Sequence, residues 1–175
     1  TTWFGSRYQI PPHQKVIRTL LFQHPPMGLF NFFSKPFLLQ HEYFGSLRFI
    51  DSKDPSKCYF EGKGHFAPTN SETEYFIAAD KSGPTSGQQQ FYEELQKNFS
   101  HYLAKIIPLI EDEFRNWKPD FSIRDFSKEF SLVVVTIPRT DIQPLIWDLA
   151  FTTIHDLNHH IQIDFNGDEP TGILI

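Results

Sequence analysis

Cysteine and long apolar runs are scarce in this chain. Cys58 is the single cysteine, so no internal disulfide can form and nothing points to an oxidising, secreted environment. The longest apolar runs, such as 19–22 and 132–135, fall far short of the ~20 residues that a transmembrane helix needs. Residues 1–10 lack the charged start and apolar middle of a signal peptide. We therefore expect a cytoplasmic protein with no membrane association.

Positive charge is scarce as well. The chain has 16 Lys and Arg residues against 21 Asp and Glu, a formal net charge of −5, and its basic residues are scattered along the sequence. The electrostatic footprint of a nucleic-acid-binding protein is therefore missing. A mildly acidic surface suits a basic protein partner.

Motifs of familiar catalytic chemistry are absent too. The sequence has no Gly-x-Ser-x-Gly elbow and no His-Glu-x-x-His zinc motif. Gly62-Lys63-Gly64 lacks the further glycine and the helix start of a phosphate-binding loop, and we interpret it as a turn. No activating base can be assigned to Cys58. We expect no enzyme activity and no cofactor.

Phenylalanine, in contrast, is abundant. The chain has 19 Phe residues, and aromatic residues make up 16% of it. Because the Phe side chain has no polar group, these rings belong either to a core or to a sticky surface. An apolar ligand-binding module, with a pocket lined by phenylalanine, is one interpretation of the excess.

The first 26 residues differ in character from the rest. They hold four prolines and show no clear hydrophobic period, and Met27-Gly28 looks like a bacterial translation start. Two interpretations stay open: residues 1–26 are a poorly packed extension, or they are an ordinary arm with a short strand at 15–22. In both cases we expect residues 27–175 to form a single α+β domain.

Seven short runs are rich in aromatic and β-branched residues and are bounded by Gly, Pro, Asn or Ser, which predicts strands. Three precede a long helix and four follow it, and the short connections are typical of antiparallel pairing. The predicted order is β-β-β-α-β-β-β-β, an α+β fold with the helix on one face of an antiparallel sheet. The predicted strands are 43–50, 57–62, 74–79, 130–137, 145–155, 159–165 and 171–175.

The long helix has clear local signals. Its start is Thr85 or Ser86 with a glutamine three residues later, the spacing of a capping box. Pro108 removes one backbone donor, so we expect a kink there, and Pro119 ends the helix. Apolar residues recur at steps of three and four, which predicts one buried stripe. The stripe consists of Phe91, Leu95, Phe99, Tyr102, Leu103, Ile106, Ile110, Phe114 and Trp117.

The strongest candidate for chemistry is the histidine-rich segment 155–160. Matching the apolar faces of the last hairpin pairs Leu149 with Phe165. The same register places His155 opposite His159 across a three-residue loop. Two imidazoles can contribute to a metal site, although zinc sites use three or four protein ligands. A metal- or histidine-dependent enzyme and a structural pair at a hairpin tip are the alternatives.

Carboxylates are grouped at two places in the sequence. A solvated helix face explains such a run, and an acidic patch that meets a basic protein is the sharper alternative. Because these side chains are expected to be exposed, they are our candidate partner contacts: Glu111, Asp112, Glu113, Asp168 and Glu169.

Glycines, aromatics and turns in several segments form a familiar layout. The segments are Phe44-Gly45-x-Leu47-x-Phe49, Tyr59-Phe60-x-Gly62, Gly83-Pro84 with 88–95, Trp147-Asp148-Leu149, His159, Ile163-Asp164-Phe165 and Pro170-x-Gly172-Ile173. In these segments the chain resembles a broad group of small, uncharacterised bacterial domains that often resemble immunity proteins of toxin systems. The resemblance spans residues 28–175 and carries over no active site. It implies a cytosolic domain that binds a toxin and blocks it by occlusion, with charge raising the association rate.

Overall fold

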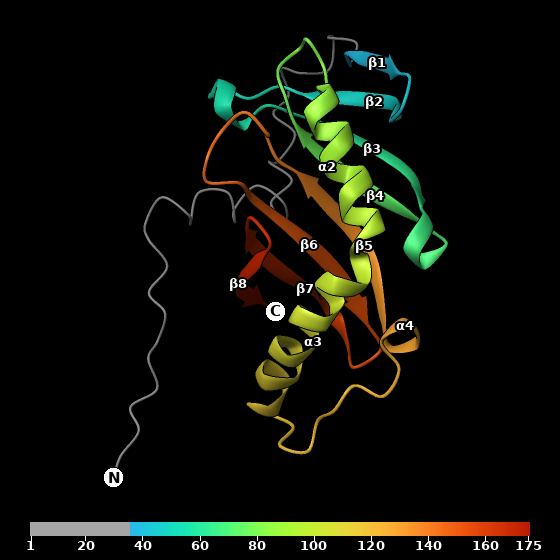
Figure 1. Cartoon of the computed structure of the whole chain (residues 1–175), viewed down its shortest axis with the longest axis vertical. Coiled ribbons are helices and arrows are strands. Elements are labelled where there is room, and N and C mark those ends of the chain that lie inside the picture. The colour runs from blue at the N-terminus through green and yellow to red at the C-terminus, as the bar shows by residue number, and fades with distance from the viewer. Residues whose placement is uncertain (1–35) are drawn as a thin grey trace. The chain divides into compact units, whose positions relative to one another are not determined.

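The computed structural model describes residues 36–175. The predictions for residues 1–26, for a strand at 15–22 and for a start at Met27 lie outside the described residues. The described chain forms one eight-stranded sheet with helices along one face (Figure 1). This confirms the α+β class. None of the helices in this part of the chain is long and apolar enough to cross a membrane.

The strands lie in the sheet in the order in which they occur in the sequence. Neighbours are antiparallel except β4 and β5, which are parallel because the helical segment between them returns the chain along the sheet. The predicted order was therefore incomplete: it lacked β1 and this parallel pair. The strands are β1 Leu38–His41, β2 Gly45–Ile50, β3 Tyr59–Phe66, β4 Ser71–Ala78, β5 Phe130–Ile137, β6 Ile146–Thr153, β7 Asp156–Asn166 and β8 Glu169–Leu174.

The predicted capping box is present at the start of the helical segment. The backbone N–H of Gln88 donates to Thr85 Oγ1 at 3.3 Å, and the backbone N–H of Thr85 donates to Gln88 Oε1 at 3.0 Å. The helices are α2 Ser86–Lys97, α3 Phe99–Arg115 and the short α4 Phe126–Glu129, and two 3-10 turns occupy Pro55–Lys57 and Ala67–Thr69.

The prediction of a single helix kinked at Pro108 was wrong. The helical segment is divided at Asn98, between α2 and α3, and not at Pro108. The side-chain amide and the backbone N–H of Asn98 both donate to the carbonyl oxygen of Glu94, at 3.0 and 2.9 Å, and so cap the end of α2. Pro108 lies within α3 at an exposed position. Water can hydrate the carbonyl that Pro108 leaves without a donor, so the helix continues.

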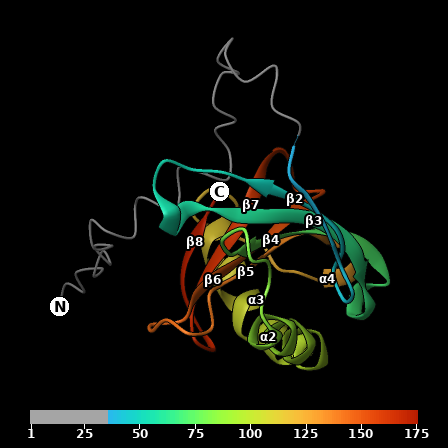
Figure 2. The same ribbon diagram turned by 90° about the horizontal axis from the view of Figure 1, so that it is seen from above.

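Helices α2 and α3 lie along one face of the twisted sheet (Figure 2), and the helical stripe packs against the core on that face. Six of the predicted residues are buried, and Phe91 and Leu103 are partly buried against the same core. Trp117 is the exception at 48% exposure. Most of the described phenylalanines are also buried, so the excess of phenylalanine largely builds the core.

Gly62 and Gly64 do not form the predicted turn but lie within β3. The ring of Tyr75 occupies the space that side chains would take: a Cβ at Gly62 would lie 2.6 Å from Tyr75 Cε2. The Tyr75 hydroxyl donates to the carbonyl oxygens of Lys63 and Phe44. These glycines therefore serve packing, not ligand binding.

Candidate interaction surface

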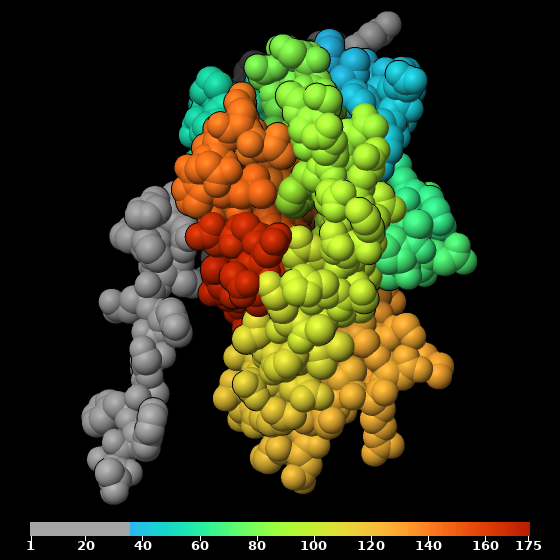
Figure 3. All heavy atoms as spheres, in the orientation of Figure 1, coloured from blue at the N-terminus to red at the C-terminus, as the bar shows by residue number. Residues whose placement is uncertain are grey.

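Three exposed apolar side chains lie at the end of the domain where α3 stops. Trp117 follows α3, Ile154 lies in the β6–β7 turn and Leu157 lies near the start of β7, with exposures of 48%, 63% and 86%. Lys118 Nζ donates to the carbonyl oxygen of His155 at 3.2 Å, which ties the two segments together. We call Trp117, Ile154 and Leu157 the apolar end. The end of α3 projects from the body of the domain (Figure 3).

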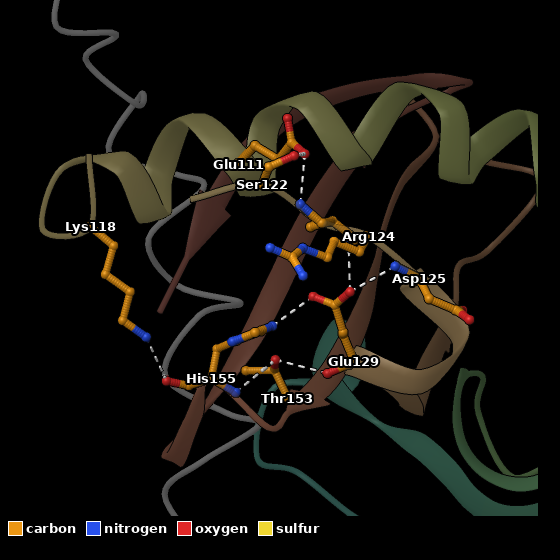
Figure 4. A network of polar contacts seen from close by, with 9 residues as sticks. Glu111, Lys118, Ser122, Arg124, Asp125, Glu129, Thr153 and His155 are labelled. Atoms are coloured by element: carbon orange, nitrogen blue, oxygen red, sulfur yellow. Dashed lines mark hydrogen bonds and ion pairs between the residues drawn. The ribbon is translucent and has the colours of Figure 1, made fainter. Parts of the chain in front are cut away.

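Glu111 holds one side of the loop 116–125 (Figure 4). Its Oε1 accepts from the backbone N–H of Ile123 at 2.8 Å and from Ser122 Oγ at 3.2 Å, and its Oε2 accepts from Arg115 at 2.7 Å. The Ile123 N–H is the main cause that lowers the pKa of Glu111, followed by Arg115 and Ser122. Glu111 is therefore an ionised support of this loop.

Glu129 holds the other side of the loop. Its Oε1 accepts from the backbone N–H groups of Arg124 and Asp125 at 2.8 and 2.7 Å, and its Oε2 lies 2.7 Å from His155 Nε2. The Asp125 N–H first, and His155 next, lower the pKa of Glu129. An ionised carboxylate only accepts, so His155 Nε2 carries the hydrogen of this bond.

The β6–β7 turn is hydrogen-bonded to Glu129 as well. The carbonyl oxygen of Glu129 accepts from Thr153 Oγ1 at 2.9 Å and from the backbone N–H of Ile154 at 3.1 Å. The His155 ring packs edge-on against Phe121, with centroids 4.9 Å apart. Glu129 thus joins the loop to the turn, in addition to the contacts that Lys118 and Phe121 make with His155 (Figure 4).

The predicted pairing of His155 with His159 was wrong. In the structure Leu149 pairs with Ile163, and a bulge precedes the pairing of Thr153 with Asp156. Trp147 instead pairs with Phe165, and their rings stack at 4.1 Å between centroids, which favours a register two residues away from the predicted one. His155 consequently falls in the turn, where it contacts Glu129.

His159 has a different partner. Its Nδ1 lies 2.9 Å from Asp156 Oδ2, and this bond is the main cause that lowers the pKa of Asp156. No group of three or more His, Cys, Asp or Glu side chains within residues 36–175 is arranged to hold a metal ion. The geometry therefore gives no support to a metal centre built on His155 and His159.

All five predicted acidic contacts have bonding partners within the domain. Arg115 bonds both Glu111 and Asp112, and Glu113 accepts from Asn116 Nδ2 at 3.2 Å. At the β7–β8 turn, Asp168 accepts from the Tyr102 hydroxyl at 2.9 Å and Glu169 pairs with Lys105 at 2.7 Å. These carboxylates lie in two groups along α3, and the first group adjoins the apolar end.

The surroundings of the apolar end carry net negative charge. Segments 111–129 and 154–160 together hold seven Asp and Glu residues and four Lys and Arg residues. The local balance is therefore acidic even though individual carboxylates are paired. A partner with a basic rim around an apolar contact is complementary to it.

A small open pocket of about 140 Å³ lies elsewhere, where the parallel strands β4 and β5 end beside α2. Gln88 lines it, but its side-chain amide donates to the carbonyl oxygens of Ala78 and Pro138 at 2.9 and 3.0 Å. Asp80 and Asp141 offset the charge of Arg139 at its rim. The pocket is thus lined by groups that serve the fold.

Sequence reasoning missed all three residues of the apolar end. Trp117 fits the helical stripe by spacing, but α3 ends at Arg115, so the helical period no longer places its side chain. Two signals pointed to exposure: Pro119 close behind Trp117, and Leu157 isolated in the polar sequence His155-Asp-Leu-Asn-His159.

Comparison with protein-family models, with curated proteins and with solved structures found no match to this chain.

Proposed function

We propose that this chain is a protein-binding domain that contacts a basic partner through the apolar end. The observation that carries the proposal is the exposure of Trp117, Ile154 and Leu157 on two segments that are joined through Glu129. Exposed apolar side chains on adjoining segments favour a binding surface more than isolated ones do.

The residue types suit this role. Tryptophan is enriched among the residues that contribute most binding energy in protein interfaces. Here the ring of Trp117 packs against Phe114, with centroids 5.1 Å apart, while about half of its surface stays exposed. One part of the Trp117 ring is therefore packed against the domain, and the exposed part is available to contact a partner.

The backbone beneath the anchor is already ordered. Glu111 and Glu129 bind backbone N–H groups on the loop 116–125, and Glu129 also binds the β6–β7 turn. A surface ordered before binding loses less conformational entropy on association. The net negative surroundings would speed the encounter with a basic partner.

The resemblance to immunity-like domains gives the proposal a specific form: a cytosolic protein that neutralises a toxin by covering its active surface. Occlusion requires a rigid complementary surface and no catalytic groups in the inhibitor. The loop 116–125 is held in place by Glu111 and Glu129, carries the exposed Trp117 and has acidic surroundings, and it meets this requirement.

Co-expression with the product of the adjacent gene tests the proposal. We expect the neighbour to be toxic alone, and we expect the full-length chain to co-purify with it and restore growth. The double variant Trp117→Ala/Leu157→Ser should lose both the complex and the rescue, whereas Ile142→Ser, at an apolar residue that is 52% exposed in the β5–β6 connection, should keep both.

Two results would count against the proposal. Rescue and complex formation that persist in the double variant would place the contact elsewhere on the domain. A neighbour that is neither toxic nor bound would remove the immunity form of the proposal.

Amide hydrogen exchange on any complex should show new protection at 116–125 and 154–158.

A further inference from the structure

Asp148 is a buried carboxyl in the middle of the sheet. It lies in β6 between Trp147 and Leu149, which belong to the core that the helices cover. Because side chains alternate along a strand, Asp148 points to the opposite face of the sheet. It is only 4% exposed there, so its charge state matters for stability.

A second carboxyl lies beside it. Asp164 on β7 is the direct cross-strand partner of Asp148. Like charges directly opposite one another in an antiparallel pair are destabilising. Gln162, two residues before Asp164, and Thr136 on β5 complete what we call the acceptor cluster: Thr136, Asp148, Gln162 and Asp164.

The cluster has more acceptors than donors. Gln162 Nε2 donates to Asp164 Oδ1 at 2.9 Å, which fixes the amide and leaves Gln162 Oε1 as an acceptor. Gln162 Oε1 and Asp148 Oδ1 are buried acceptors with no hydrogen-bond partner, whereas the Thr136 hydroxyl near Asp148 can donate as well as accept. A buried acceptor without a donor is costly, and one proton on Asp148 would supply a donor.

We propose that Asp148 keeps its proton up to near neutral pH, that its hydroxyl donates within the acceptor cluster, and that loss of its proton weakens the β6–β7 pair. The proposal is independent of the partner-binding surface. It makes the centre of the sheet sensitive to pH near neutrality.

The surroundings of Asp148 support this assignment. Burial first, and the charge of Asp164 as a smaller cause, raise the pKa of Asp148 to about 7 against the opposing effect of the Thr136 hydroxyl. β5 has no ionisable side chain, and β7 presents Asp164 and, two residues before Gln162, His160.

The expected pH dependence follows from proton linkage. An unfolded aspartate has a pKa of about 3.9, so between about pH 4 and about pH 7 the folded chain binds one more proton here than the unfolded chain. The contribution of Asp148 to stability therefore falls as pH rises through this interval and levels off above about pH 7.

Carboxyl carbon NMR of the full-length chain tests the proposal directly. We expect the Asp148 resonance to titrate near neutrality. In urea unfolding, Asp148→Asn should remove part of the decline in midpoint between about pH 5 and about pH 7, while the control Asp141→Asn should keep it.

Three outcomes would overturn the proposal. They are an Asp148 resonance that titrates in the ordinary acid range, an unchanged pH slope in Asp148→Asn, and stabilisation by millimolar Ca²⁺ or Mn²⁺ that Asp148→Asn abolishes. The last outcome would mean that the carboxylate of Asp148 binds a metal ion and does not carry a proton. If Asp148→Asn does not fold, the titration of the unmodified protein still decides.

Discussion

His155 and Glu129 lie 26 residues apart in sequence and form one bonded pair, with Nε2 and Oε2 2.7 Å apart. The side chain of Glu129 is only 11% exposed, and it also caps the end of the loop 116–125 through two backbone N–H groups. A histidine that suggests a metal ligand by sequence thus fixes the position of a turn.

Glu129→Gln should destabilise the domain by about 1–3 kcal/mol, because it replaces charge-assisted hydrogen bonds with weaker ones. The lowered pKa of Glu129 means that its contribution is present above about pH 4.3, the pKa of an unfolded glutamate, and is lost as pH falls through the folded-state pKa. Urea unfolding at neutral and acidic pH measures both effects. Glu113→Gln is the matched control, and equal losses in the two variants would contradict a special role for Glu129.

The two described tryptophans should respond very differently to replacement by phenylalanine. Trp147 is 1% exposed, and its Nε1 donates to the carbonyl oxygen of Gly167 at 2.8 Å, so Trp147→Phe should cost about 1–3 kcal/mol. Trp117→Phe removes only half-exposed surface and should stay within about 0.5 kcal/mol. Chemical denaturation of both variants checks this, and a large loss in Trp117→Phe would mean that Trp117 serves the fold more than a partner.

Gly62→Ala should destabilise the sheet by about 1–3 kcal/mol through overpacking. The new Cβ would lie 2.6 Å from both Leu47 Cδ2 and Tyr75 Cε2. Gly167→Asn is the control: φ there is +59°, nothing lies within 4 Å, and asparagine tolerates left-handed backbone. Thermal unfolding of the two variants should separate them, and a neutral Gly62→Ala would show that Tyr75 can move away.

Pro108→Ala should stabilise the domain by about 2–2.6 kcal/mol. Alanine restores a helical N–H donor inside α3 and removes a residue that disfavours helix interiors by about 3 kcal/mol, and the greater freedom of the unfolded chain offsets about 0.4–1 kcal/mol of that gain. An increase in the urea midpoint is the expected result. A loss of stability would mean that the proline shapes α3 in a way that its exposed position does not suggest.

Local signals in the sequence were sufficient for elements whose stabilisation is itself local. The capping box at Thr85 and Gln88 and the strand at 130–137 both appear where they were predicted, because a cap depends on residues three apart and a strand on alternation along its own length. The helical stripe from Leu95 to Phe114 followed from the same kind of period.

Tertiary packing decided the features that depend on distant partners. The parallel pairing of β4 with β5, the register that separates His155 from His159, and the burial of Asp148 depend on side chains that meet across the sheet. Glu111 has the sequence signature of a solvated charge, but a loop eleven residues later turns back onto it. Composition and period determine which segments form helices and strands, whereas the contacts among those segments determine which polar groups support the fold and which apolar residues remain exposed at its surface.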